Sequence, residues 1–104
     1  MEITSSQRAY LRGLAHDLDP IFRVGKESVT PEFTEAVNEA LEKRELIKIS
    51  VLKNCEERPY DLADTLAGRT KAQVVQVIGR RFVLYRRSKN DPKIELPKKG
   101  KKDA

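Results

Sequence analysis

The chain has 104 residues, of which 38% are hydrophobic and 36% are charged, and it carries a formal net charge of +5. This length suits one small domain, which buries a modest core but cannot enclose a large cofactor. No apolar run is long enough for a transmembrane helix, one cysteine cannot build a disulfide framework, and one histidine cannot form a metal-binding pair. We therefore expect no cofactor, no metal and no membrane partner.

The positive charge is concentrated in the second half of the chain. Residues 1–52 carry 7 basic and 9 acidic side chains, whereas residues 53–104 carry 14 basic and 7 acidic ones. Such an uneven basic balance in a small domain indicates a polyanionic partner. The N-terminus lacks the basic start and apolar core of a signal peptide, so we expect a cytoplasmic protein.

The first predicted helix spans residues 5–17, because Thr4 and Gln7 form a capping box before apolar residues at helical spacing. The Asp-Pro pair at 19–20 ends this helix. Residues 21–24 are β-branched and aromatic, and they predict a short strand. The face of the helix that we expect to be buried consists of Leu11, Leu14, Ala15 and Leu18.

A second helix is predicted over residues 31–44, where Thr30 can cap the helix and Pro31 takes its first position. Residues 46–52 alternate between apolar and polar side chains, which predicts a strand with one buried face. The expected buried face of the second helix consists of Phe33, Val37, Ala40 and Leu41.

A third helix is predicted over residues 56–68, with Gly68 as its C-terminal stop. Strands follow at 73–78 and 81–86, and the Gly-Arg pair between them suits a two-residue hairpin turn. The order α-β-α-β-α-β-β predicts an α/β fold, an α+β sandwich, in one compact domain over residues 1–97.

The end of the chain differs in composition from the domain. Residues 98–104 are rich in lysine and have no large apolar side chain. We expect them to form a basic, disordered tail.

No group of residues forms a catalytic motif. His16 has no serine or cysteine partner in a recognisable pattern, and the acidic neighbours of Cys55 disfavour its reactive thiolate. The glycine-rich loops of nucleotide-binding enzymes are also missing. We therefore do not expect an enzyme.

Two groups of basic residues indicate a function more strongly than any candidate catalytic residue does. One lies in and after the final hairpin, and the other lies between residues 8 and 26. Such groups bind the regularly spaced phosphates of a nucleic acid by charge and counterion release, although a solubilising surface is the alternative. The basic residues that we single out are Arg8, Arg12, Arg23, Lys26, Arg80, Arg81, Arg86 and Arg87.

The loop from Gly25 to Ser28 leaves a strand and enters a helix whose first turn has free N–H groups, which is the setting of an anion site. Gly25 permits close approach of the backbone and Lys26 adds positive charge, whereas Glu27 must point away from a phosphate. A plain strand-to-helix turn is the alternative interpretation.

Four stretches together resemble one known family, the CRM domain (chloroplast RNA splicing and ribosome maturation), and most closely its bacterial YhbY-like form. They are QRAYLRGLAH at 7–16, VGKESVT at 24–30, ELIKI at 45–49 and QVIGRRFVLYR at 76–86. The resemblance implies a compact domain with a mixed four-stranded sheet, like the C-terminal domain of translation initiation factor three. It also implies RNA binding without catalysis and association with precursors of the large ribosomal subunit.

The GxxG loop of this family falls on the four residues from Gly25 to Ser28, and Ser28 replaces the second glycine. If this position needs a positive φ, serine adopts it only at an energetic cost, whereas its hydroxyl can donate to a phosphate or cap the helix. The resemblance and the basic groups together predict an RNA-binding site formed by Arg8, Arg12, Arg23, Gly25, Lys26, Glu27, Ser28, Thr30, Arg80, Arg81, Arg86 and Arg87.

The expected partner is RNA, namely large-subunit ribosomal RNA or its precursor in the pre-ribosomal large subunit, bound by a monomer. No base-reading motif is evident, so shape and charge are expected to dominate recognition. Two other classes of partner stay open, namely DNA and protein. The basic hairpin and tail could bind DNA, and a basic ribosomal protein could dock on the acidic side of the second helix, formed by Glu32, Glu35, Glu39 and Glu42.

Overall fold

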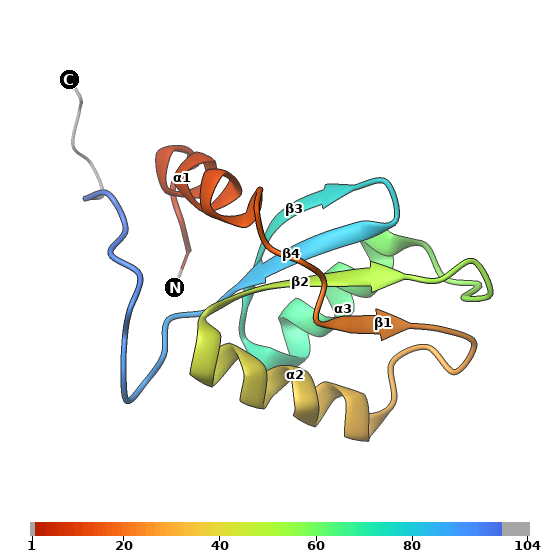
Figure 1. Cartoon of the computed structure of the whole chain (residues 1–104). Helices are drawn as coiled ribbons and strands as arrows, with labels where there is room; N and C mark the ends of the chain where they lie inside the picture. The colour runs from red at the N-terminus through yellow and green to blue at the C-terminus, as the bar shows by residue number, and fades with distance from the viewer. Residues whose placement is uncertain (1, 99–104) are drawn as a thin grey trace.

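Four strands form one mixed sheet that has helices on both faces (Figure 1). The structure, a computed structural model, describes residues 2–98, so the predicted basic tail beyond Lys98 lies outside the described residues. The elements are α1 (Ser5–Ala15), β1 (Phe22–Val24), α2 (Pro31–Arg44), β2 (Leu46–Val51), α3 (Pro59–Thr70), β3 (Gln73–Ile78) and β4 (Arg81–Tyr85). The strands lie in the order β1-β2-β4-β3, with β1 and β2 parallel and the other neighbours antiparallel. The predicted fold class and element order are confirmed.

Three of the predicted helix ends are wrong. Helix α3 begins at Pro59 instead of residue 56, and it runs through Gly68 to Thr70. The residue that ends it is Lys71, which takes the left-handed conformation with φ 60° and ψ 37° and donates its N–H to the carbonyl of Ala67. A lysine can adopt the left-handed conformation at a modest cost in free energy, so the helix does not have to end at the nearest glycine. Helix α1 likewise ends at residue 15 and not at 17.

The larger core lies between one face of the sheet and helices α2 and α3. Val37 and Leu41 of α2 and Leu62 of α3 are buried against Phe82 and Leu84 of β4. The predicted buried face of α2 is confirmed, because its two remaining members, Phe33 and Ala40, also pack on this core. Burial of such side chains contributes roughly 1.5–3 kcal/mol each, so this core holds α2 and α3 in place.

The smaller core lies on the opposite face, under α1. Leu11 and Ala15 are buried there, as predicted, but Leu14 and Leu18 are 40% and 37% exposed. The third member of the buried face is Gln7, one turn before Leu11. Its side-chain amide donates to the carbonyl of Pro97 at 2.8 Å and accepts from the N–H of Thr4 at 2.9 Å. A glutamine with both ends hydrogen-bonded can be buried. Leu18 lies beyond the end of α1 and is therefore not part of its buried face.

Two carboxylates hold the segment after β4 against the rest of the domain. Glu45 is fully buried and accepts backbone N–H groups from Ser88 at 2.8 Å, Lys93 at 2.9 Å and Ile94 at 2.7 Å. Burial raises the pKa of Glu45, but these three donors outweigh that effect and leave its pKa below the usual value. Through these bonds Ile94 is placed on the smaller core.

The second carboxylate is Glu42, one turn earlier in α2. It accepts the Ser88 hydroxyl at 2.7 Å and the backbone N–H groups of Lys89 and Asn90, both at 3.1 Å. The Ser88 hydroxyl is the largest cause that lowers the pKa of Glu42 from 4.5 to about 2. The segment 88–94 is therefore fastened by ionised carboxylates.

This fastening predicts an acid-sensitive fold. A carboxylate whose pKa is lowered by folding stabilises the fold fully above its unfolded pKa, and the stabilisation is lost as pH falls through the folded pKa. Since Glu42 shifts from 4.5 to about 2, the free energy of unfolding should be flat near neutral pH and fall between about pH 4.5 and 2. Urea denaturation at a series of pH values measures this free energy of unfolding. In the Glu42→Gln variant the free energy should depend less on pH. A wild-type stability that is unchanged down to pH 3 would contradict the assignment.

Candidate nucleic-acid interface

One half of the sheet face that carries α1 is not covered by the helix. Side chains alternate between the two faces of a strand, so residues spaced by two share a face. At one end of this face Leu46, Val83 and Tyr85 are buried beneath α1, together with Val75 of β3. At the other end the side chains are exposed or partly exposed. We call this part the open sheet face, and it consists of Arg23, Lys48, Ser50, Gln76, Ile78 and Arg81.

The strand register brings basic side chains together on the open sheet face. Arg23 of β1 pairs with Ser50 of β2, and Ser50 pairs with Arg81 of β4. Neighbouring strands lie about 4.8 Å apart, so the two arginines stand about 10 Å apart in one row, with a serine between them. Lys48 follows two residues away on β2. Among residues 2–98, no ion pair involves any of these three cations.

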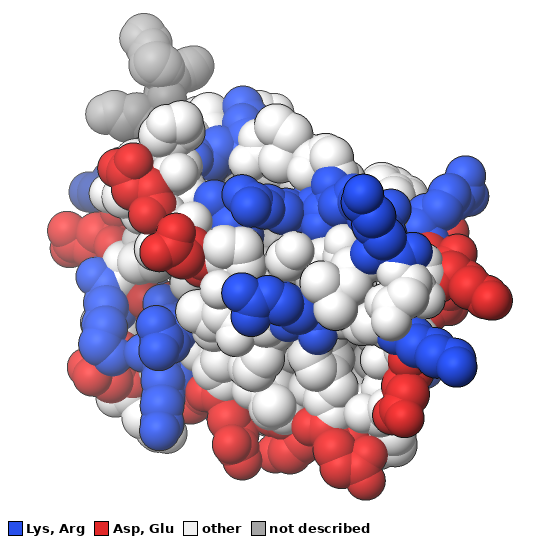
Figure 2. Space-filling model, turned by 45° about the vertical axis from the view of Figure 1, so that its right-hand side comes forward, with Lys and Arg blue, Asp and Glu red and all other residues white. Residues whose placement is uncertain are grey.

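Many of the basic and acidic side chains gather on different parts of the surface, with both kinds present at its left and right edges in Figure 2. Figure 2 shows a band of Lys and Arg side chains across the upper part of one face, at the level of α1 and the sheet in Figure 1. Asp and Glu side chains gather along the lower edge, at the level of α2. Helix α2 exposes Glu32, Glu35 and Glu39. Such a separation directs a polyanion to the α1 side of the sheet.

The two arginines of α1 have different surroundings. The guanidinium of Arg8 donates to the carbonyl of Val74 in β3, so this partly buried side chain links the helix to the edge of the sheet. Arg12 lies one turn further along on the same side of α1 and is exposed. Arg12 is therefore the α1 cation that a phosphate can reach without breaking an internal bond.

The β1–α2 loop is a tight turn with a charged tip. The N–H of Ser28 donates to the carbonyl of Gly25 at 3.0 Å, which leaves Lys26 and Glu27 exposed between them. A Cβ on Gly25 would lie 3.3 Å from the side-chain oxygen of Asn54, so a larger residue would have to displace this side chain where the loop meets the β2–α3 loop. Of the two exposed charges, that of Lys26 suits a phosphate.

The first turn of α2 has few N–H groups to offer an anion. Thr30 caps the helix by accepting the N–H of Phe33 at 3.0 Å, and its carbonyl accepts the N–H of Thr34 at 2.9 Å. Pro31 has no N–H. Thr30 therefore has a structural role at this helix start, and Lys26 is the group of the loop best placed to meet a phosphate.

Ser28 takes a backbone conformation that favours glycine, with φ at 59°. The left-handed region costs an L-residue roughly 1–2 kcal/mol, and only the bond from the Ser28 hydroxyl to the exposed carboxylate of Glu57 offsets part of this. We expect Ser28→Gly to raise the free energy of unfolding by about 0.5 kcal/mol, because relief of strain outweighs an exposed hydrogen bond.

Ser28→Ala is the matched control for this substitution. It removes the hydroxyl but keeps the strained φ, so it should lower the stability slightly. Thermal denaturation of the three proteins measures the order glycine, serine, alanine. A glycine variant that is less stable than the alanine variant would contradict the strain at this position.

The β3–β4 turn adds a further arginine at the same end of the sheet. Gly79 has a φ of 58°, and the predicted two-residue turn is confirmed by the pairing of Ile78 with Arg81. The guanidinium of Arg80 donates to the carbonyls of Val51 at 3.0 Å and Leu52 at 2.6 Å. Arg80 thus braces the end of β2. Figure 1 shows this turn beside the β1–α2 and β2–α3 loops.

The last two predicted arginines lie at the other end of β4. The guanidinium of Arg86 donates to the side chain of Asn38 at 2.5 Å, to its carbonyl at 3.1 Å and to the carbonyl of Thr70 at 2.9 Å, and it lies 3.6 Å from Glu42. Arg86 therefore joins α2 to the end of α3 and has little capacity left for RNA. Arg87 is exposed, but far along β4 from the open sheet face.

The structure thus separates predicted site residues that can meet a phosphate from others that hold the fold together. It gathers Arg23, Lys26 and Arg81 around one end of the sheet, with Arg12 on the neighbouring helix. It commits Arg8, Thr30, Arg80 and Arg86 to internal bonds. It adds Lys48 and Ser50, which we did not single out, although the alternation in the predicted strand 46–52 already places both on the face away from the larger core.

Other kinds of site find no support in the part of the chain that the structure describes. Among residues 2–98, no three His, Cys, Asp or Glu side chains are grouped as metal ligands. Within the same range, no helix has the length and apolar character needed to cross a membrane.

Comparison with known proteins gives consistent matches. Residues 3–86 match the model of the CRS1/YhbY (CRM) domain. The chain is 50% identical over 95 residues to the probable RNA-binding protein YqeI of Bacillus subtilis, covering 91% of this chain and 99% of that protein. An RNA-binding protein of Haemophilus influenzae is 36% identical over 97 residues, which is 93% of this chain and 97% of the relative. These names describe RNA binding and no enzymatic activity, in agreement with the expectation that the chain is not an enzyme.

A solved structure has the same fold. The solution structure of protein SAV1595 from Staphylococcus aureus superposes with a TM-score of 0.77 at 45% sequence identity. The match covers 92% of this chain and all of that chain. The α+β architecture described above is therefore that of a known structural family.

Proposed function

Because the chain belongs to the CRS1/YhbY (CRM) domain family, we propose that it is an RNA-binding protein that acts without catalysis. The observation that carries this proposal is the open sheet face, where Arg23, Lys48 and Arg81 stand together without ion-pair partners among the described residues. The names of the relatives support the same class of ligand.

The chemistry of the face suits a phosphate backbone. Arginine presents a planar set of donors that fits phosphate oxygens, and each cation that neutralises a phosphate releases condensed counterions. Arg12 and Lys26 extend the same surface on two sides, from α1 and from the β1–α2 loop. Recognition through this surface is governed by shape and charge, as in most binding of folded RNA.

The affinity for structured RNA and for duplex DNA, measured at equal salt, tests the class of nucleic acid. We expect tighter binding to RNA, because an A-form helix presents its backbone and 2′-hydroxyl groups across a wide, shallow groove. The logarithm of the association constant should fall linearly with the logarithm of the salt concentration. Equal binding to both polymers would favour a general polyanion binder, and tighter binding to DNA would contradict the proposal.

The more specific part of the proposal concerns the target. We place the protein in the cytoplasm, as a monomer bound to precursors of the large ribosomal subunit through their ribosomal RNA, which is the role that the family resemblance implies. Sedimentation of a cell lysate on a sucrose gradient, with and without nuclease, tests this. Co-migration with large-subunit precursors that is lost after nuclease is expected. A signal confined to the top fractions would move the target to another RNA.

A second candidate function follows from the acidic side of α2. Glu32, Glu35 and Glu39 are exposed there, whereas Glu42 is occupied by the segment after β4, so the acidic surface is shorter than the sequence predicts. A basic ribosomal protein fits such a surface. In that case lysine substitutions at the three exposed glutamates would abolish ribosome association, while the affinity for free RNA would survive.

A further inference from the structure

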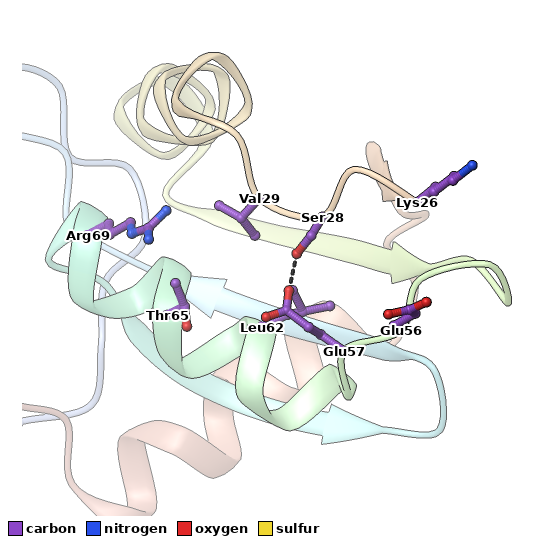
Figure 3. A pocket seen from close by; sticks show the side chains of 8 residues that line it. All are labelled: Lys26, Ser28, Val29, Glu56, Glu57, Leu62, Thr65 and Arg69. Atoms are coloured by element: carbon purple, nitrogen blue, oxygen red, sulfur yellow. Dashed lines mark hydrogen bonds between the residues drawn. The ribbon is translucent and has the colours of Figure 1, made fainter.

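A pocket lies between the β1–α2 loop and the start of α3 (Figure 3). Its volume is about 420 Å³, within the range of about 300–1,000 Å³ that is typical of small-ligand sites. The side chains that line it are Lys26, Ser28, Val29, Glu56, Glu57, Leu62, Thr65 and Arg69.

The pocket has an apolar part and a polar part. Val29 is partly buried and presents carbon atoms to the pocket, whereas Leu62 is almost completely buried and offers a ligand almost no surface. Glu56 and Glu57 supply carboxylates on the α3 side of the pocket. One oxygen of Glu57 already accepts the hydroxyl of Ser28, and this bond fixes the carboxylate across the pocket from the loop.

The charges are arranged in a way that separates a phosphate from a base. Figure 3 shows Lys26 pointing away from the pocket, toward solvent, while Arg69 lies at the opposite end. The two carboxylates repel a phosphate from the space between these cations. An RNA strand that contacts Lys26 with its backbone can therefore place beside these carboxylates only a group that donates hydrogen bonds.

We infer that this pocket receives an unpaired guanine of the bound RNA, an inference that rests on the proposed RNA binding. An ionised carboxylate only accepts hydrogen bonds and can accept two at once. On its Watson–Crick edge guanine carries two adjacent donors, the ring N1–H and the 2-amino group. The other bases place an acceptor beside their donor on that edge, and the acceptor is repelled by a carboxylate. Unpaired bases are read on this edge in RNA recognition.

The remaining polar groups complete the match. The third group on the Watson–Crick edge of guanine is the O6 acceptor, and Thr65 and Arg69 provide donors on the same wall of the pocket. The ring face of the base packs on Val29. The open sheet face lies on the α1 side of the sheet and this pocket on the α3 side, and Lys26 of the β1–α2 loop lines the pocket at the end of the sheet where the two meet.

An RNA hairpin with a single bulged nucleotide tests the inference by fluorescence anisotropy. The bulged nucleotide is guanosine, adenosine, uridine or inosine, and a fully paired hairpin serves as the reference. We expect the guanosine bulge to bind about tenfold more tightly than the adenosine bulge, in the range of one bidentate base contact. Inosine lacks the 2-amino group and should lie between them.

The variant Glu57→Gln assigns this preference to the pocket. An amide presents a donor beside its acceptor, so the ratio of the guanosine and adenosine affinities should fall several-fold toward equality. The ratio is the readout, because removal of a negative charge strengthens binding to every hairpin alike. Glu35→Gln, which makes the same charge change on the exposed side of α2, should keep the wild-type ratio.

The outcomes separate this inference from the proposed function. Equal binding of all bulged hairpins by the wild type, a preference for another base, or an unchanged ratio in Glu57→Gln would each overturn the guanine pocket while RNA binding stands. Failure of every hairpin to bind, including the fully paired one, would overturn the proposed function itself.

Discussion

Replacement of Glu45 by glutamine is expected to lower the free energy of unfolding by about 3 kcal/mol, since an amide cannot accept three N–H donors and its own NH2 faces at least one of them. Glu45 is fully buried, and its two oxygens accept the N–H groups of Ser88, Lys93 and Ile94 at 2.7–2.9 Å. Its φ of 67° is also unfavourable for a residue with a side chain. The fold accepts this strain at the end of α2 because the side chain anchors the segment after β4.

Chemical denaturation measures the loss, and hydrogen exchange locates it. The amides of Ser88, Lys93 and Ile94 should lose protection first in Glu45→Gln. Glu39→Gln makes the same change on the exposed side of α2 and should stay within about 0.5 kcal/mol of the wild type. A Glu45→Gln protein as stable as the Glu39→Gln protein would contradict the anchoring role.

Replacement of both Arg23 and Arg81 by glutamine is expected to weaken binding to a structured RNA about 100-fold at low salt. A charge-assisted hydrogen bond contributes about 1.5 kcal/mol or more, which is roughly tenfold in affinity for each arginine. The loss should be similar for different RNA sequences, because these side chains meet phosphates and not bases. The slope of the salt dependence should become shallower by about 2.

The matched control removes two positive charges elsewhere. Lys43 and Arg44 are exposed in the last turn of α2 and lie outside the open sheet face. Their joint replacement by glutamine changes the net charge equally and should weaken binding only a few-fold. Equal losses in the two double variants would show that net charge alone, and not the open sheet face, governs binding.

The fold could be predicted where the decisive signals are local. The caps at Thr4 and Thr30, the alternation in strand 46–52 and the Gly-Arg turn each act within a few residues, and the structure has all of them. The prediction failed where a segment distant in the sequence determines which side chains are buried. Gln7 joins Leu11 and Ala15 on the buried face because Pro97, 90 residues away, accepts its amide hydrogen.

The candidate site shows the same division. Arg23 and Arg81 are exposed basic residues of strands, as a reading of the sequence expects, but their common row depends on the pairing of both strands with β2. Arg86 is indistinguishable from them in the sequence. Its guanidinium is taken up by Asn38, which is 48 residues away, and by Thr70. Only the tertiary structure separates an arginine that holds helices together from one that can meet a phosphate.

We expect RNA to lie on the open sheet face. The most direct test is a titration of the isotope-labelled protein with a hairpin RNA, followed residue by residue through the NMR shifts of its backbone amides. We predict that the largest changes fall on Arg23, Lys48, Ser50 and Arg81, with Lys26 beside them, while Glu35 and Glu39 stay unmoved. Changes that centre on the acidic side of α2 and leave the open sheet face unaffected would contradict the claim.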